Sequence, residues 1–391
     1  MDATLTDGVV RAGSDARERF YDARGYGRPV GGDLALAPVE AAHLLYRGDL
    51  DSVDGMGFRA FLASAAVPET AVLVYKDLRD RGFYLSPARE RWVADRDTTG
   101  PVDFVVYPRG KGPWDDDVAY RVAVVGEREP VPAVDLGEVV VAVVDEESEI
   151  TYLETDRPTV SGSSGVALPD GVAGDLLADR VFCWGPPASL YERGFYGQRL
   201  DEQGGDVLQL SLVEAAYLAR RGALAVEGGP GAVVERGREV EGDRFDRRLR
   251  AYTALRERGV VPKTGFKFGA DFRTYADVES VADLGHSEWL VRVLAAGHAF
   301  APRDLALDVR LAHGVRKEMV FALVEGADDA DEDQHGGADG DRTGDTDGGI
   351  GETVGARLGA LLGGLLGELL GKTLGTSLLK RLLDIGGDDG G

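Results

Sequence analysis

The chain consists of two halves that repeat one another, and this repeat constrains the fold more than any other feature of the sequence. The segment 36–48 matches the segment 210–222, and each ends in a glycine of the kind that commonly follows a helix. The motif Asp-Phe-x-x-Tyr occurs at 103–107 and again at 271–275. A repeat of this kind predicts two similarly folded units in tandem.

Helical and strand-like segments alternate in the same order in both halves. Amphipathic segments end in glycine at 75–82 and 252–259, as helices do. Valine-rich or aromatic runs that are typical of strands follow at 102–107, 120–125 and 139–144, with counterparts at 271–275, 289–294 and 319–324. We therefore predict an α+β fold built by tandem duplication, in which each copy has a small helical and β N-terminal subdomain and a mixed β-sheet flanked by helices.

This pattern predicts a set of domain boundaries. In chain order these are an N-terminal subdomain of copy one (1–66), a sheet domain of copy one (67–158), a linker (159–178), an N-terminal subdomain of copy two (179–247), a sheet domain of copy two (248–325), an acidic disordered linker (326–349), a Gly/Leu-rich helix (350–385) and a tail (386–391). Residues 1–158 are called the first half below, and residues 159–325 the second half.

The charge balance is strongly acidic. The chain has 68 Asp and Glu against 44 Lys and Arg, a net charge of -24, and lysine is rare. Such a composition is typical of proteins that stay soluble in concentrated salt, which predicts a halophilic archaeon. At molar ionic strength the Debye length is about 3 Å, so the net charge does not exclude RNA as a partner.

Other features restrict the compartment. Cys183 is the single cysteine, which excludes an internal disulfide and a cysteine-rich zinc site. The first residues have neither the basic nor the apolar part of a signal peptide. We expect a cytoplasmic protein whose body does not enter a membrane.

The C-terminal segments differ from the rest of the chain. The stretch 326–349 is rich in acidic residues and offers little to bury, which predicts disorder. In 350–385, Gly and Leu each recur every four residues, which predicts a helix. This helix could pack on itself or on the body, or associate with a membrane through small-residue contacts. Its charged residues interrupt the apolar run, so we do not predict a transmembrane span.

Three titratable residues of the second half mark a candidate site. His286 is matched by Asp117 and Lys317 by Gly137, whereas Tyr275 has a tyrosine as its counterpart. Each of the three stands at the end or the start of a predicted strand, so one edge of one sheet would bring them together. A repeat kept only for packing has no reason to differ at these positions, so the difference indicates a site in the second half.

Tyr, His and Lys can together cleave RNA without a metal or a cofactor. The reaction needs a base for the 2′-hydroxyl, an acid for the departing 5′-oxygen and a positive charge beside the phosphate. A free tyrosine ionises near pH 10, so Tyr275 needs a nearby cation to act as a base, and Lys317 can supply it. The sequence has no Walker loop and no His-Glu-x-x-His motif.

Each of these residues also has a structural interpretation. Tyr275 could be a half-buried strand aromatic, and Lys317 a solvated cation at a strand edge. His286 could be structural, with His298 and His313 as competitors for its role. The presence of all three in the second half, with His286 and Lys317 absent from the matched positions of the first half, favours the site.

The chain resembles the archaeal tRNA-splicing endonucleases of the duplicated, homodimeric type. The segments that carry the resemblance are 252–259, 271–275, 285–291 and 310–322. It implies a metal-independent RNA endonuclease that excises introns from precursor tRNA at a bulge-helix-bulge and leaves 2′,3′-cyclic phosphate and 5′-hydroxyl ends. It also implies the three roles, which are general base for Tyr275, general acid for His286 and transition-state stabilisation for Lys317. The resemblance further implies that 248–325 is the catalytic domain and that 67–158 is a catalytically silent endonuclease-like domain.

The resemblance implies two further contacts. Arg310 would stack on a flipped base of the bulge, and a phosphate contact is the alternative. An acidic loop with Asp115, Asp116 and Asp117 would dock into the partner subunit of a homodimer, and a solvated turn is the alternative.

The C-terminus departs from the family pattern. The family has a final apolar strand that carries a second stacking arginine, and here the acidic and Gly/Leu-rich segments take its place. A frameshift, a fusion and a loss of activity explain this equally well. Two other functions stay open, namely a catalytically impaired RNA-binding or assembly subunit of the same family and an adaptor tethered to a membrane or a partner by the C-terminal segment.

Overall fold

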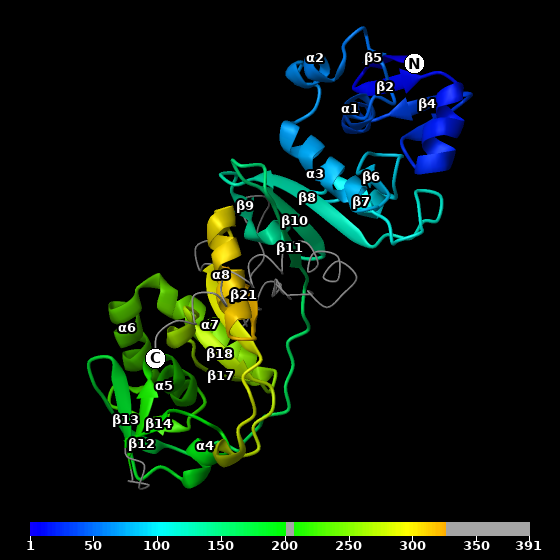
Figure 1. The fold of residues 1–391 in the computed structure, drawn as a ribbon. Helices are drawn as coiled ribbons and strands as arrows, with labels where there is room; N and C mark the ends of the chain where they lie inside the picture. The colour runs from blue at the N-terminus through cyan, green and yellow to red at the C-terminus, as the bar shows by residue number, and fades with distance from the viewer. Residues whose placement is uncertain (201–206, 326–391) are drawn as a thin grey trace, which may run out of the picture.

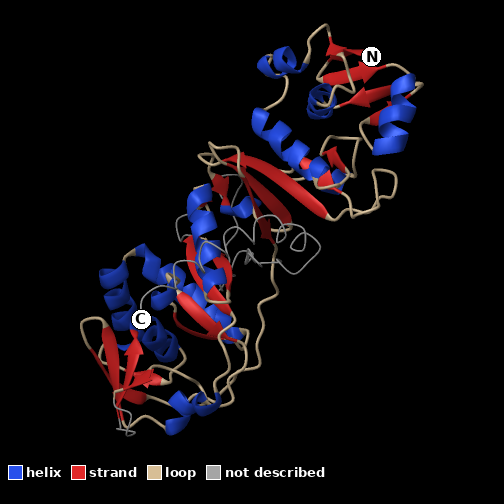
Figure 2. Cartoon of the chain, in the orientation of Figure 1, coloured by secondary structure: helices blue, strands red, loops and turns tan. Residues whose placement is uncertain are grey.

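The computed structural model describes residues 1–200 and 207–325, which form an elongated molecule with one half of the chain at each end (Figure 1). Each half contributes two β-sheets with helices packed on them, which confirms the predicted α+β class (Figure 2). The predicted linker 326–349, helix 350–385 and tail 386–391 lie outside the described residues.

A five-stranded sheet opens each half, and its strand order is the same in both. In the first half the order is β3-β4-β2-β1-β5, formed by β1 (Asp2–Thr6), β2 (Val9–Ala12), β3 (Arg28–Val30), β4 (Asp33–Leu36) and β5 (Ser52–Val53). In the second half it is β14-β15-β13-β12-β16, formed by β12 (Val172–Leu176), β13 (Arg180–Trp184), β14 (Gln198–Arg199), β15 (Val207–Ser211) and β16 (Leu224–Ala225). The accompanying helices are α1 (Pro38–Tyr46) and α2 (Phe58–Ala63) in the first half, and α4 (Ala188–Glu192), α5 (Leu212–Arg220) and α6 (Gly229–Glu241) in the second.

A longer helix then leads into a second, mixed sheet. In the first half α3 (Glu69–Asp80) precedes the order β11-β10-β8-β7-β6, formed by β6 (Leu85–Pro87), β7 (Phe104–Val106), β8 (Tyr120–Gly126), β10 (Val139–Val144) and β11 (Ile150–Thr155). In the second half α7 (Asp243–Glu257) precedes the order β17-β18-β19-β21, formed by β17 (Val261–Thr264), β18 (Phe272–Tyr275), β19 (Trp289–Ala295) and β21 (Glu318–Val324), with α8 (Pro302–Gly314) crossing between the last two. Among the described residues of the second half, no strand takes the place of β11.

The strand registers of the two mixed sheets agree with the alignment of the halves. The paired residues are Phe104 with Val122 and Val122 with Val140 in the first half, and Phe272 with Val291 and Val291 with Val320 in the second. When the two halves are aligned on these pairs, His286 falls at the position that Asp117 holds in the first half, and Lys317 falls at the position of Gly137. The differences between the halves therefore fall at equivalent positions of one backbone.

The aspartate of the repeated Asp-Phe-x-x-Tyr motif has a structural role. Asp103 accepts a hydrogen bond from the backbone N–H of Val124 at 2.7 Å, and Asp271 accepts one from Val293 at 2.8 Å. Each carboxylate thus links the start of one strand to the middle of its neighbour. This contact explains why the motif occurs in both halves, whether or not the half carries a site.

An apolar core joins the two halves. Val131 and Val141 of the first half and Leu290, Phe300 and Phe321 of the second belong to one buried cluster. Strand β9 (Val131–Pro132) pairs with β20 (Ala299–Phe300) across the same junction, where Figure 1 shows α8 beside the mixed sheet of the first half. Because burial of apolar surface is the main favourable term in association, this seam holds the two halves as one body.

Two predicted boundaries differ from the structure. The predicted linker 159–178 includes strand β12, in which Val172 and Leu176 pack against the core of the second half. The predicted boundary between 247 and 248 falls inside α7, which begins directly after Gly242. Both elements have polar sequences, which contain glycine in β12 and are rich in arginine in α7. Tertiary contacts define these elements, and local composition does not reveal such contacts.

Candidate active site

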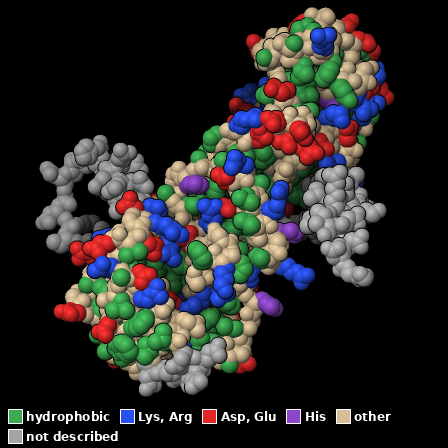
Figure 3. Space-filling view, turned by 60° about the vertical axis from the view of Figure 1, so that its left-hand side comes forward, with side chains coloured by type: hydrophobic (Ala, Val, Ile, Leu, Met, Phe, Trp, Pro, Cys, Tyr) green, Lys and Arg blue, Asp and Glu red, His purple; other side chains and the backbone are tan. Residues whose placement is uncertain are grey.

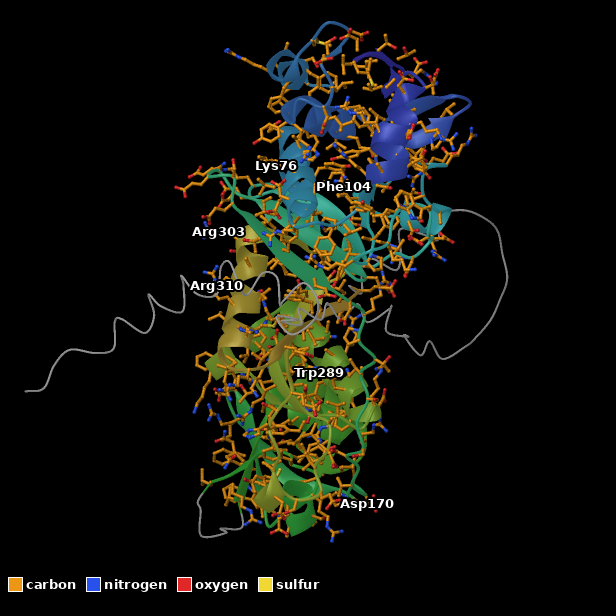
Figure 4. The ribbon with its side chains drawn as sticks, turned by 45° about the vertical axis from the view of Figure 1, so that its right-hand side comes forward. Lys76, Phe104, Asp170, Trp289, Arg303 and Arg310 are labelled. Carbon is orange, nitrogen blue, oxygen red and sulfur yellow. The ribbon has the colours of Figure 1, made fainter. Side chains whose placement is uncertain are left out.

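The three candidate residues of the second half lie at one edge of its mixed sheet. Tyr275 is the last residue of β18, His286 lies three residues before β19, and Lys317 directly precedes β21. Because β18 runs antiparallel to β19 and β19 runs parallel to β21, these three strand ends share an edge. Figure 4 labels Trp289, the first residue of β19, in this half of the molecule.

Hydrogen bonds hold this edge together. The backbone N–H of Glu288 donates to the Thr274 carbonyl at 3.2 Å, and that of Glu318 donates to the Glu288 carbonyl at 3.4 Å. The Lys317 ammonium donates to the carbonyl of Ser287, the residue that follows His286. The lysine is therefore fixed against the backbone beside the histidine.

Tyr275 has a buried ring and a hydroxyl without a fixed partner. The side chain is 8% exposed and packs with Val261 and Val278, and its ring centroid lies 5.7 Å from that of Phe195. Within residues 1–200 and 207–325 its hydroxyl makes no hydrogen bond. The packing of the ring agrees with the interpretation of Tyr275 as a half-buried strand aromatic. Its oxygen, which is not held by a hydrogen bond, is free to interact with a substrate hydroxyl.

The three histidines among the described residues of the second half have different surroundings. His286 is exposed in the loop before β19, and His313 is exposed at the end of α8. The ring of His298 packs edge-on against Phe300 with centroids 4.6 Å apart. Burial, and then the charge of Arg292, lower the pKa of His298, which stands at the seam between the halves and away from the edge that carries the candidate residues.

Lys317 is half-buried, and its ammonium group is affected by the charge of Arg273. Burial lowers the pKa of its ammonium group, and the positive charge of Arg273 lowers it further. Its nitrogen also lies 5.9 Å from the ring centroid of Phe268. A cation held between an apolar ring and a second cation is placed to interact with an anion.

The two contacts expected from the family resemblance involve exposed residues. Arg310 projects from α8 (Figure 4) and makes no hydrogen bond or ion pair within the described part of the chain. No contact links it to the three residues at the sheet edge. Asp115, Asp116 and Asp117 are exposed in the first half. On the face of the molecule that Figure 3 draws, acidic side chains gather on this half.

The acidic loop is held in a defined turn. Asp115 accepts a hydrogen bond from the Gly112 backbone at 2.8 Å and forms an ion pair with Lys111 at 3.7 Å. Trp114 lies 5.9 Å from the ring centroids of both Tyr21 and Tyr84. These contacts present the acidic side chains outward.

The structure reveals charged residues that the sequence comparison missed. Lys263 donates to Glu214 at 2.8 Å and to the Phe195 and Gly197 carbonyls at 3.1 and 2.9 Å. Arg273 lies directly opposite Lys263 in the β17–β18 pairing. Aligning β6 and β7 with β17 and β18, residue by residue, could have identified both.

Metal-ligand clusters and membrane-spanning helices are both absent from the described residues. No group of three or more His, Cys, Asp or Glu side chains in the part of the chain that the structure describes is arranged to hold a metal ion. No helix there combines the length and the apolarity needed to cross a membrane.

Comparison with protein families identifies the family to which the fold belongs. The profile of the tRNA intron endonuclease catalytic C-terminal domain matches residues 245–332, which include all three residues of the sheet edge. The profile of the tRNA intron endonuclease N-terminal domain matches twice, at 1–62 and 172–235. The chain belongs to the tRNA intron endonuclease family. The two N-terminal matches correspond to the two five-stranded sheets with their helices, so this family's N-terminal domain occurs twice in the chain.

Relatives from halophilic archaea are more than half identical to this chain, in agreement with its acidic composition. A tRNA-splicing endonuclease of Haloarcula marismortui is 69% identical over 330 residues, which are 84% of this chain and 97% of the relative. The tRNA-splicing endonuclease of Natronomonas pharaonis is 64% identical over 85% of this chain and 97% of its own length, and that of Haloferax volcanii is 60% identical over 83% and 96%. The chain is thus an endonuclease of this family. The region that it shares with each of these relatives covers nearly the whole length of the relative.

Proposed function

We propose that this protein excises introns from precursor tRNA, cutting at a bulge-helix-bulge and leaving 2′,3′-cyclic phosphate and 5′-hydroxyl ends. One observation supports the proposal most strongly. Tyr275, His286 and Lys317 lie at one edge of the mixed sheet, inside the stretch that matches the family's catalytic domain. The names of the haloarchaeal relatives support the substrate class.

The proposed chemistry assigns one step to each residue. Tyr275, ionised to its phenolate and without a fixed partner for its oxygen, takes the proton of the 2′-hydroxyl and becomes a neutral phenol as the 2′-oxygen attacks the phosphorus. The bond from phosphorus to the 5′-oxygen breaks, and His286, exposed on its loop, protonates that oxygen. Lys317 balances the extra negative charge on the phosphate in the transition state.

The proposal includes a homodimer that works on precursor tRNA in the cytoplasm. Arg310, exposed and without an ion pair, is available to stack on a splayed bulge base. The outward carboxylates of Asp115, Asp116 and Asp117 would meet the partner subunit. An RNA-binding subunit without cleavage activity is the second candidate, favoured by the acidic and Gly/Leu-rich sequence that replaces the family's final apolar strand after residue 325.

Cleavage of a bulge-helix-bulge transcript by purified full-length protein in EDTA and high salt tests the proposal. We expect cleavage with cyclic phosphate ends, and a loss of about 10³-fold in the single-turnover rate of His286→Ala. His313→Ala, which removes an exposed histidine at the end of α8, is the matched control and should retain the wild-type rate. RNA binding without cleavage by the wild-type protein would favour the second candidate.

A further inference from the structure

A cavity of about 380 Å³ lies next to the candidate site, between the first sheet of the second half and strands β17 and β18. Its walls include polar side chains from both sheets, among them Gln209 and Thr264, and the aromatic side chains of Phe195 and Tyr252. A cavity of this size and mixed character can hold part of a nucleotide.

Four cations line the cavity, and three of them are already paired. Arg180 bonds Asp179 at 2.7 Å, Lys263 bonds Glu214 at 2.8 Å, and Arg248 bonds Glu241 at 2.6 Å. Arg273 is the fourth, and within the described residues its guanidinium group has no carboxylate and no hydrogen-bond partner. Its Nε atom is buried without an acceptor.

The surroundings of Arg273 repel a bare cation. It stands directly opposite Lys263 on the neighbouring strand, and like charges in that arrangement destabilise a sheet. Its charge also contributes to lowering the pKa of Lys317. An arginine that is half-buried, unpaired and close to two lysines stabilises the protein poorly, and an anion bound there would relieve all of these costs.

Arg273 also lies beside the residue proposed as the base. Its guanidinium carbon is 5.8 Å from the ring centroid of Tyr275, two residues along β18, so both side chains lie on the same face of the strand. In the first half the residues equivalent to Lys263 and Arg273 are Ser86 and Val105, which face each other in the same register. The half without the candidate site therefore lacks this cation too.

We propose that Arg273 binds a backbone phosphate of the RNA next to the scissile phosphate, and that the adjoining cavity receives the nucleotide attached to it. The inference rests on the proposed function and adds a substrate contact to it. The planar guanidinium group matches two phosphate oxygens, which a lysine at this position would not.

The test compares Arg273→Met, Arg273→Lys and Arg238→Met. The probe is a bulge-helix-bulge RNA with 2′-deoxyribose at the cleavage positions, which removes the attacking hydroxyl and allows binding to be measured alone. Arg238 is a matched control because it lies on α6 and is paired with Asp246 at 2.7 Å, so Arg238→Met removes the same charge away from the cavity.

We expect Arg273→Met to weaken binding of this RNA about 10-fold or more and to reduce the dependence of log affinity on log salt by about 1. Arg273→Lys should keep the salt dependence and recover part of the affinity. The melting temperature of Arg273→Met should equal or exceed that of the wild type, because an unpaired buried cation is removed. A purely structural arginine would give the opposite result, with a lower melting temperature and unchanged affinity.

The outcomes separate this inference from the proposed function. If wild-type protein binds the deoxyribose-containing probe and cleaves the all-ribose RNA, while Arg273→Met matches Arg238→Met in affinity and salt dependence, the contact is wrong and the function stands. If the wild type neither binds nor cleaves, both are wrong. If Arg273→Met does not fold, unchanged binding by Arg273→Lys at every salt concentration overturns the bidentate contact.

Discussion

Glu40 and Glu214 occupy equivalent positions in the two halves and have similar backbone partners. Glu40 accepts hydrogen bonds from the backbone of Gly27 at 2.7 Å and of Ala37 at 2.8 Å. Glu214 accepts them from Gly197 at 3.0 Å and from the third residue before it at 3.1 Å. Each carboxylate thereby caps the first long helix of its half and fixes the turn that leads into it.

The two glutamates differ in charge environment. Burial raises the pKa of Glu40 to about 7, and its hydrogen bonds do not offset this. Burial also raises the pKa of Glu214, but the charge and hydrogen bond of Lys263 outweigh burial and bring it to about 2. The residue equivalent to Lys263 in the first half is Ser86, which carries no charge.

This contrast extends along the edge of the mixed sheet. The second half has Lys263, Arg273, His286 and Lys317 where the first half has Ser86, Val105, Asp117 and Gly137. The backbone and its register are the same, so the difference between the halves is one of electrostatics. We therefore propose that a single fold serves as a scaffold in the first half and carries a cationic site in the second, and variants at equivalent positions can test this.

Lys317→Met gives the largest expected effect among these variants. We expect the single-turnover rate of RNA cleavage to fall about 10³-fold, which is about 4 kcal/mol, because the charge beside the phosphate is lost. Lys76→Met in the first half, where Lys76 pairs with Asp80 at 2.6 Å, is the control and should cleave normally. Equal rates for the two variants would remove Lys317 from the site.

Lys263→Met should destabilise the protein by at least about 3 kcal/mol, because it leaves Glu214 buried without its cation. The free energy of unfolding by denaturant at constant high salt measures this. Replacing Glu214 by Gln in the same protein should recover part of the loss, since the buried charge is then gone. A loss below about 1 kcal/mol for Lys263→Met would mean that the pair does not act as the geometry indicates.

Glu40 should make the first half less stable as the pH rises. Its folded pKa of about 7 lies above the ordinary 4.5, so the folded state holds a proton that the unfolded state has lost. The stability is present at lower pH and decreases as the pH rises through 7, by up to about 3 kcal/mol at pH 7.

The difference in unfolding free energy between wild type and Glu40→Gln, followed from about pH 5 to pH 7.5, should show this slope. The matched difference for Glu214→Gln should be flat over that range, because the folded pKa of Glu214 is about 2 and its contribution is lost only as the pH falls below the ordinary value. Parallel curves for the two variants would contradict the comparison.

The sequence predicted the parts of the site that depend on strand order. Tyr275, His286 and Lys317 could be assigned to strand ends because Asp271, Gly285 and the run after Lys317 mark those strands locally. The register then brought the three ends together as expected.

The charge network could not be predicted in the same way. Glu214 and Lys263 are far apart in the sequence, and their contact depends on how the first sheet packs against β17. The lack of a partner for Arg273 becomes visible only after the partners of the other cations are known. Such properties depend on tertiary packing, which the repeat alone does not specify.

Tyr107→Phe gives the smallest expected effect. The Tyr107 hydroxyl donates to Ser86 at 2.9 Å and accepts from Arg28 at 3.3 Å, so its removal should cost about 1 kcal/mol of stability. Thermal unfolding at fixed salt checks this value. A gain in stability would mean that these hydrogen bonds do not hold the first half together.

The central claim is that two equivalent tyrosines have different tasks, one structural and one chemical. Single-turnover cleavage of a bulge-helix-bulge RNA by Tyr275→Phe and Tyr107→Phe, measured side by side in EDTA and high salt, tests it most directly. We predict a loss of about 10³-fold or more for Tyr275→Phe and a rate within about twofold of wild type for Tyr107→Phe. Normal cleavage by Tyr275→Phe, or an equal loss in both variants, would contradict the account.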